Sequence, residues 1–146
     1  VEANLKFYCK LYSKDYALID RYKDELEVAA YLKRKASKLS LGMKQRVGVF
    51  IALIASDELI LLDEPTNGLD LGAKHDVYLK ARDLAEKHQK GVIFITSEID
   101  ELFSVCNRVY VFAFGDIVEE FTRDQFDKQK ILEAAFRTSG GNENGE

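Results

Sequence analysis

The sequence contains few of the residues that constrain a small protein covalently. Its 146 residues include one proline and two cysteines. Cys9 and Cys106 lie far apart and lack the spacing of metal ligands, so we expect free thiols in a reducing cytoplasm. With 47% hydrophobic residues, the chain is of single-domain size and can bury one sizeable core.

Long apolar runs and an excess of positive charge are also absent. The longest apolar run, Val47 to Ala55 counting Gly48, is far shorter than the roughly 20 residues that cross a bilayer. Any membrane association would therefore need a partner. The net charge is −4, from 21 basic and 25 acidic residues, so we expect no nucleic-acid partner.

The most informative stretch is an apolar run that ends in carboxylates. Leu59 to Leu62 follow one another without alternation and lead into Asp63 and Glu64. This pattern predicts a strand buried on both faces, whose carboxyl end lies where ligands bind in open α/β sheets. One carboxylate could hold Mg²⁺ while the other orients or deprotonates an attacking water. Pro65 predicts an extended backbone at Glu64.

A second motif lies just upstream and reads Leu39-Ser40-Leu41-Gly42-Met43-Lys44-Gln45-Arg46. Ser40 is a good N-cap, so we expect a helix to begin after it. The free N–H groups of a first helical turn, together with the positive helix end, attract polyphosphates. Taken singly, the two motifs also fit a solvated acidic strand end and an ordinary capped helix. Their combination points to ATP chemistry.

In this order, the motifs resemble the signature motif and the Walker B motif of ABC transporter ATPases. The resemblance implies that Asp63 supports Mg²⁺ and that Glu64 is the catalytic glutamate that polarises the hydrolytic water. It also implies the cofactors ATP and Mg²⁺.

The same resemblance implies that this chain contributes to the site of another copy or homologue. The signature-matching residues Ser40, Leu41 and Gly42 would face the γ-phosphate of ATP held by a second ATP-binding domain in a dimer. Asn67 to Asp70 correspond to the D-loop, so Asp70 would touch the partner domain's site.

Two positions depart from the family pattern. The family usually has two glycines after the signature serine, so Leu41 is tolerated only if its side chain points away from the phosphate. The segment Gly91 to Glu101 resembles the one that bears the switch histidine, which here is replaced by Ser97. Serine cannot act as a charged donor at neutral pH, so the site is either weakened or non-hydrolysing. The histidines His75 and His88 are expected on a surface helix in solvated or capping roles.

The phosphate-binding loop Gly-x-x-x-x-Gly-Lys-Ser/Thr does not occur in the sequence, and the family's glutamine loop is not seen either. The resemblance extends from Val1 to about Ala135. We therefore interpret the chain as a C-terminal fragment of an ATPase domain, and expect the fragment alone to be inactive.

The periodicity and breakers predict alternating helices and strands. The expected helices are Ala3–Tyr12, Tyr16–Ala30, Met43–Ser56, Ala73–Gln89 (closed by Gly91), Ile99–Val105 and Arg123–Phe136. The expected strands are Leu59–Asp63, the segment starting at Gly91, Arg108–Phe114 and Ile117–Phe121, with a hairpin turn at Gly115-Asp116. Strand, helix and strand in succession predict parallel pairing, which would bring Glu64 and Ser97 to one sheet edge.

These elements predict an α/β fold, and the family resemblance implies that it is a P-loop NTPase-like ABC ATPase domain fragment. Residues 1–38 would be part of a helical subdomain, and residues 39–137 the signature helix and a mainly parallel sheet with flanking helices. Residues 138–146, polar and glycine-rich, are expected to be disordered.

The leading functional hypothesis is an ATP-binding subunit of an ABC transporter, which couples ATP hydrolysis to transport. Its partners would be a second ATP-binding domain and transmembrane permease subunits, at the cytoplasmic face of the membrane. The alternative is a degenerate regulatory cassette that binds a partner's ATP without hydrolysing it, which Ser97 favours and Glu64 opposes. A soluble ATPase of DNA repair or translation is disfavoured by the acidic net charge.

Overall fold

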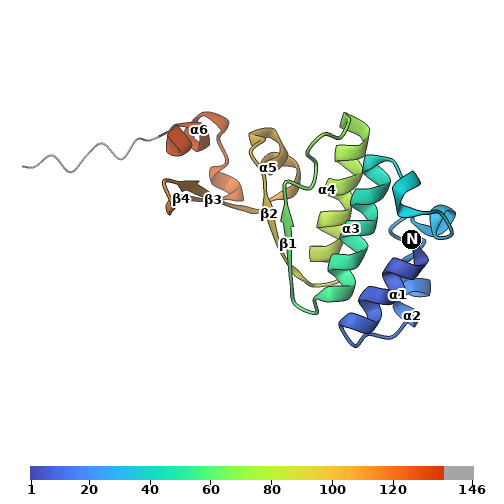
Figure 1. Cartoon of the computed structure of the whole chain (residues 1–146). Helices are drawn as coiled ribbons and strands as arrows, with labels where there is room; N and C mark the ends of the chain where they lie inside the picture. The colour runs from blue at the N-terminus through green and yellow to red at the C-terminus, as the bar shows by residue number, and fades with distance from the viewer. Residues whose placement is uncertain (137–146) are drawn as a thin grey trace, which may run out of the picture. The chain divides into compact units, whose positions relative to one another are not determined.

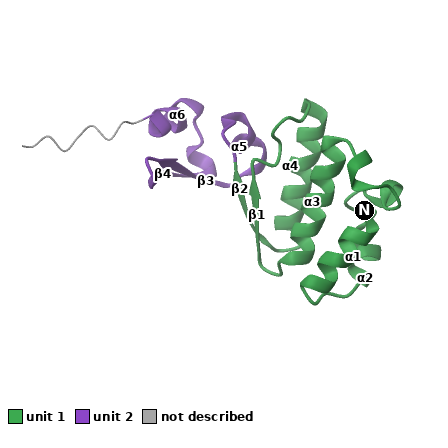
Figure 2. Cartoon of the chain, in the orientation of Figure 1, with its two compact units in different colours: residues 1–95 green, residues 96–146 purple. Residues whose placement is uncertain are grey.

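The computed structural model describes residues 1–136 and forms two compact units. The first comprises residues 1–95 and the second begins at Thr96 (Figure 2). The predicted boundary after residue 38 falls within the first unit, and the division into subdomains stays a prediction. The tail predicted to be disordered, residues 138–146, lies outside the described residues.

The chain begins with short helical elements. Helix α1 spans Glu2–Leu11, α2 spans Ala17–Tyr22, and two single 3₁₀ turns follow at Ala29–Tyr31 and Ala36–Lys38. The first helix was predicted to within a residue at each end. The second prediction was wrong beyond Tyr22, because the chain leaves the helix and Glu27 adopts a left-handed backbone with φ +56°. A helix cannot continue through such a residue.

Two long helices, α3 (Leu41–Ala55) and α4 (Leu71–Glu86), form the centre of the first unit. Helix α3 contacts α1, α4 and β1, and α4 also contacts β2 (Figure 1). The side chains of Phe50 and Ile54 on α3 are 0% and 1% exposed. The buried face of α3 is therefore the core of this unit.

Strands β1 (Leu59–Asp63) and β2 (Gly91–Ile95) pair in parallel, with Asp63 opposite Ile95. This confirms the predicted pairing. Burial of β1 on both faces was wrong: Ile60 and Leu62 are 2% and 7% exposed, whereas their neighbours Leu59 and Leu61 are 55% and 59% exposed. Successive strand residues point to opposite faces, so α3 and α4 cover only one face of this sheet.

The end of α4 also differs from the prediction. The helix ends at Glu86, and the left-handed residue that reverses the chain is Gln89, with φ +52°. Gly91 instead begins β2, where its N–H donates to the carbonyl of Glu58 at 2.7 Å. The glycine therefore serves the strand start rather than the helix stop.

The second unit contains α5 (Ile99–Val105), β3 (Arg108–Ala113), β4 (Asp116–Thr122) and α6 (Lys128–Phe136). The two strands form an antiparallel hairpin whose turn residues are Phe114 and Gly115, at φ +56° and +92°, one residue earlier than predicted. Two positive φ values are typical of the tight hairpin turn that matches strand twist. The core of the second unit consists of Val109, Val111, Phe121, Ile131 and Ala134.

The predicted C-terminal helix is interrupted near its start. Arg123–Gln125 form a separate 3₁₀ turn, capped by reciprocal hydrogen bonds between Thr122 and Gln125, and α6 begins only at Lys128. Local capping at Thr122 competes with helix propagation. Among the described residues, none of the helices is long and apolar enough to cross a membrane.

The one-sided burial of β1 can be tested with two adjacent leucines. Leu62→Ala should lower the free energy of unfolding by about 2–5 kcal/mol, because it empties a buried site against the helices. Leu61→Ala, on the exposed face, should change it by less than about 0.5 kcal/mol. Urea unfolding followed by circular dichroism measures both values. Equal losses for the two variants would mean that β1 is covered on both faces.

Candidate functional site

The carboxyl end of β1 carries Asp63 and Glu64 into a series of tight turns. Asp63 is exposed, and Glu64 is half-buried. The N–H of Glu64 donates to the carbonyl of Ile95 at 2.9 Å, which extends the ladder by one residue. Its own carbonyl accepts from the N–H of Asn67 at 3.1 Å. These bonds hold Glu64 firmly between the sheet and the following turn.

The backbone of Glu64 corrects the prediction made from Pro65. Its φ is +43°, in the left-handed region and not extended. The bias of a following proline is local, and here the ladder bond to β2 and the turn to Asn67 override it. A non-glycine residue in this region costs free energy and occurs preferentially at functional sites.

The signature-like motif begins helix α3 as predicted. Ser40 is the N-cap, and its hydroxyl accepts a hydrogen bond from the N–H of Met43 at 3.3 Å. The side chain of Leu41 is 45% exposed. Its Cδ2 lies so close to Gly68 that a Cβ at that glycine would be 3.2 Å away. Leu41 is therefore directed towards the D-loop-like turn.

The turn before α4 depends on Gly68 and Asp70. Gly68 has φ +73°, which favours glycine, and contact with Leu41 adds a steric reason. Asp70 is the N-cap of α4, and its Oδ1 accepts from the N–H of Ala73 at 2.9 Å. The carboxylate predicted to reach a partner site thus also has a local capping role.

The two capped helix starts share one pocket of about 270 Å³. The lining residues are Ser40, Leu41, Gly42, Met43, Arg46, Gly68, Leu69, Asp70 and Ala73. Four sequence-predicted residues, Ser40 to Gly42 and Asp70, are therefore brought together. The other three are not part of this pocket.

Ser97 belongs to the second unit, in the segment between β2 and α5. Its neighbour Thr96 donates from Oγ1 to Glu101 Oε2 at 2.7 Å and accepts from the N–H of Glu98 at 3.0 Å. Glu101 is only 2% exposed. This local bonding fixes the start of α5, and the predicted proximity of Ser97 to Glu64 stays a prediction.

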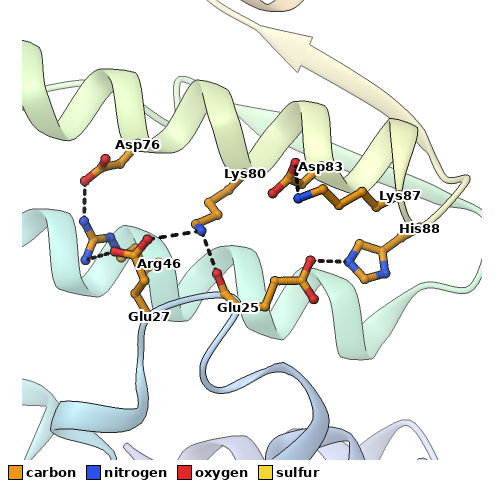
Figure 3. Close-up of polar contacts among 8 residues, drawn as sticks. All are labelled: Glu25, Glu27, Arg46, Asp76, Lys80, Asp83, Lys87 and His88. Carbon is orange, nitrogen blue, oxygen red and sulfur yellow. Dashed lines mark hydrogen bonds and ion pairs between the residues drawn. The ribbon is translucent and has the colours of Figure 1, made fainter.

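A network of ion pairs lies beside the pocket and connects α3, α4 and the turn after α2 (Figure 3). Arg46 pairs with Asp76 of α4 and, through Nη1, with Glu27 Oε2 at 3.1 Å. Lys80 of α4 lies 3.2 Å from Glu27 Oε1. The Glu27 carboxylate is therefore shared between two cations from different helices.

Two groups in this network have altered acid–base properties. Burial lowers the pKa of the Arg46 guanidinium, but its hydrogen bond to Asp76 and the charge of Glu27 outweigh burial and raise the pKa overall. Burial raises the pKa of the Tyr31 phenol beside it. The Tyr31 hydroxyl makes no hydrogen bond within residues 1–136.

The same network gives His88 a partner. It follows the end of α4, and its Nε2 lies 2.8 Å from Glu25 Oε1, with 15% of the His88 side chain exposed. For His88, the prediction of a solvated or capping role on a surface helix was therefore wrong, whereas His75 is exposed on α4 as expected. A long-range contact between residues 25 and 88 has no counterpart in local periodicity, and neither Glu25 nor Glu27 was identified from the sequence.

Asp63 at the end of β1 could contribute to a Mg²⁺ site only together with ligands from outside the described residues. Among the described residues, no group of three or more histidine, cysteine or carboxylate side chains could hold a metal. Mg²⁺ commonly takes one or two protein carboxylates and completes its shell with water and phosphate oxygens. Exposed Asp63 can supply one such carboxylate.

Comparison with known proteins supports the resemblance. Residues 4–67 match the family model described as "ABC transporter". The chain is 31% identical over 121 residues to the L-arabinose transport ATP-binding protein AraG of Geobacillus stearothermophilus, covering 82% of this chain and 23% of AraG. It is 44% identical over 103 residues to a ribose/galactose/methyl galactoside import ATP-binding protein of Rhizobium meliloti, covering 70% of this chain and 20% of that protein.

Solved structures agree with the fold. An ABC transporter of the metal-chelate type, in an inward-facing conformation, superimposes with a TM-score of 0.74 at 26% identity, over 83% of this chain and 48% of that one. The ATP-binding cassette MJ1267 superimposes with a TM-score of 0.68 at 23% identity, over 86% and 48%. These structures confirm the predicted fold class.

The left-handed backbone of Glu64 can be tested by comparing two replacements. Glu64→Gly and Glu64→Ala both remove the side chain, but only alanine must be forced into positive φ. We expect the glycine variant to be more stable than the alanine variant by roughly 1–2 kcal/mol. Urea unfolding of both variants measures the difference. An alanine variant that equals or exceeds the glycine variant would show that residue 64 is not left-handed.

Proposed function

Because the chain belongs to the family of ABC transporter ATP-binding domains, we propose that it is part of an ATPase subunit that works as a dimer with a second ATP-binding domain. The subunit couples ATP binding and hydrolysis to transport through transmembrane permease subunits. The observation that carries this proposal is the shared pocket of the signature-like helix start and the D-loop-like turn. The chain spans only about a fifth of the relatives it matches, 23% and 20% of their lengths.

In the proposed dimer, the pocket faces the polyphosphate bound by the second domain. Ser40, Leu41 and Gly42 present the first-turn N–H groups of α3 and the positive end of its dipole. The exposed Leu41 side chain lies against Gly68. This position supports the expectation that Leu41 leaves the backbone open to the phosphate. Asp70 is placed on the same rim by its cap of α4.

The carboxyl end of β1 supplies the hydrolytic residues. Asp63 would hold Mg²⁺, which neutralises charge on the phosphates when it is bound. Glu64 would accept a proton from, or orient, the attacking water. Its fixed backbone, bonded to Ile95 and Asn67, limits the directions in which the carboxylate can point. Ser97 would donate a neutral hydrogen bond to the γ-phosphate where the family has a histidine.

The names of the relatives support import of a sugar. One is an L-arabinose transport protein and the other a ribose/galactose/methyl galactoside import protein. We therefore propose a monosaccharide as the transported substrate and the cytoplasmic face of the membrane as the location.

A regulatory cassette that binds a partner's ATP without hydrolysing it is the second candidate. Ser97 favours it, because a serine hydroxyl carries no positive charge. The two candidates differ in whether Glu64 is required for turnover.

Nucleotide binding by this chain alone tests the assignment of the pocket to a partner's ATP. Since the sequence has no phosphate-binding loop, we expect the Kd for a fluorescent ATP analogue to be above about 1 mM, with or without Mg²⁺. Fluorescence anisotropy measures the affinity. Tight, Mg²⁺-dependent binding by the isolated chain would contradict the proposal that the pocket serves ATP bound by a second domain.

Turnover by the natural polypeptide tests the catalytic role of Glu64. The polypeptide carrying this sequence should be tagged in its own cells and purified with its membrane partners. We expect Glu64→Gln to lower kcat for ATP about 10²–10⁴-fold, because the general base is lost. Glu58→Gln makes the same chemical change at an exposed residue just before β1 and should leave kcat unchanged.

Release of phosphate is the readout for both variants. Full activity of Glu64→Gln would exclude Glu64 as the base and favour the regulatory cassette, which binds a partner's ATP without hydrolysing it. A complex that binds ATP but shows no turnover even with native Glu64 would contradict the proposed ATPase.

A further inference from the structure

Glu27 has a strained backbone conformation in a hydrogen-bonded turn. Its φ of +56° lies in the left-handed region, which is unusual for a long side chain. The turn is closed on both sides: the N–H of Glu27 donates to the carbonyl of Asp24 at 3.0 Å, and that of Val28 donates to Lys23 at 2.8 Å. Such strain persists only where other interactions hold the residue in place.

The interactions that hold Glu27 come from two different helices. One carboxylate oxygen lies 3.1 Å from Arg46 of α3, and the other lies 3.2 Å from Lys80 of α4 (Figure 3). The Arg46 and Lys80 side chains are only 24% and 13% exposed. Half-buried cations depend on their partners more strongly than exposed ones do, because less water is available to replace the lost contact.

Arg46 links this carboxylate to the pocket. It lines the pocket together with Ser40, Gly42 and Asp70, and it also pairs with Asp76, which lies in the second turn of α4. One side chain, Arg46, therefore connects Glu27 with both helix starts.

We infer that Glu27 is a positioning residue: through Arg46 and Lys80, it couples residues 23–28 to the spacing of the two helix starts that form the pocket. The inference rests on the proposed function only in taking the ligand of this pocket to be a nucleotide phosphate. Glu27 itself does not line the pocket.

The neighbouring glutamate provides a matched control. Glu25 lies in the same turn, and its carboxylate pairs with His88 at 2.8 Å, while its carbonyl accepts from Lys80 at 2.6 Å. None of these contacts involves Arg46. Glu25→Gln removes the same charge from the same turn without disturbing the guanidinium that lines the pocket.

Nuclear magnetic resonance of the ¹⁵N-labelled chain tests the coupling directly. Glu27→Gln should shift the amide resonances of Gly42 and Gly68, which lie in the two halves of the pocket. Glu25→Gln should leave both resonances in place. Glu27→Gly should produce the same shifts as Glu27→Gln, because it also removes the carboxylate. Glycine adopts a positive φ without strain, so this variant tests the inference even if the glutamine variant folds poorly.

A second background shows whether the effect passes through Arg46. In an Arg46→Gln background, Glu27→Gln should no longer shift Gly42, because the link is already broken. Unchanged resonances in both Glu27 variants, or equal shifts in Glu25→Gln, would overturn the inference. So would a shift that persists at full size in the Arg46→Gln background.

The assembled ATPase provides the functional readout. Glu27→Gln should raise KM for ATP about 5-fold or more while kcat stays unchanged, since pocket geometry and not the hydrolytic carboxylate is altered. A parental KM in Glu27→Gln would overturn the inference. If the unmodified assembly hydrolyses no ATP, the proposed function fails, and the resonance shifts alone decide the role of Glu27.

Discussion

Burial of helix α3 is the interaction on which the first unit depends. Its inner face, which includes the fully buried Phe50, contacts α1, α4 and β1, so three separate segments are fixed against one element. Burial of apolar area is the main favourable term in folding. Since Ser40 caps the start of this helix, the packing that stabilises the unit also sets where the signature-like motif lies.

The parallel pair of strands then determines where the remaining site residues lie. Helix α4 joins β1 to β2, so both strands run in the same direction and their carboxyl ends lie at one edge. The turn that leaves this edge carries Glu64 and continues to Asp70, the cap of α4. One chain segment thus connects the carboxylates of Asp63 and Glu64 with the pocket beside α3.

Left-handed residues mark the positions where the chain reverses next to the site. Glu64, Gly68 and Glu27 all have positive φ, and each lies in a turn beside the end of a helix or strand. At Gly68 the conformation is free of strain, whereas the two glutamates must be held by their contacts. The sheet also has an exposed apolar face, on which the paired residues Leu61 and Ile93 are 59% and 47% exposed.

Local chemistry determined much of this structure, and the sequence was sufficient wherever it did. The strand Leu59–Asp63 and the helix Ile99–Val105 were predicted with their observed bounds, and the Ser40 cap was predicted by residue type. Periodicity, capping and apolar runs act over a few residues, so they can be read without the fold. The family motifs, likewise, are contiguous.

Only the tertiary structure decided which surfaces are covered and which distant charges meet. An unbroken apolar run cannot show that Leu62 is buried and Leu61 is not, because that depends on the helices that pack on one side. The left-handed Glu64 runs against the bias of Pro65, since bonds to β2 and the next turn outweigh a local preference. The contacts of Glu27 with Arg46 and Lys80 join residues far apart in sequence, and only folding brings such charges within reach.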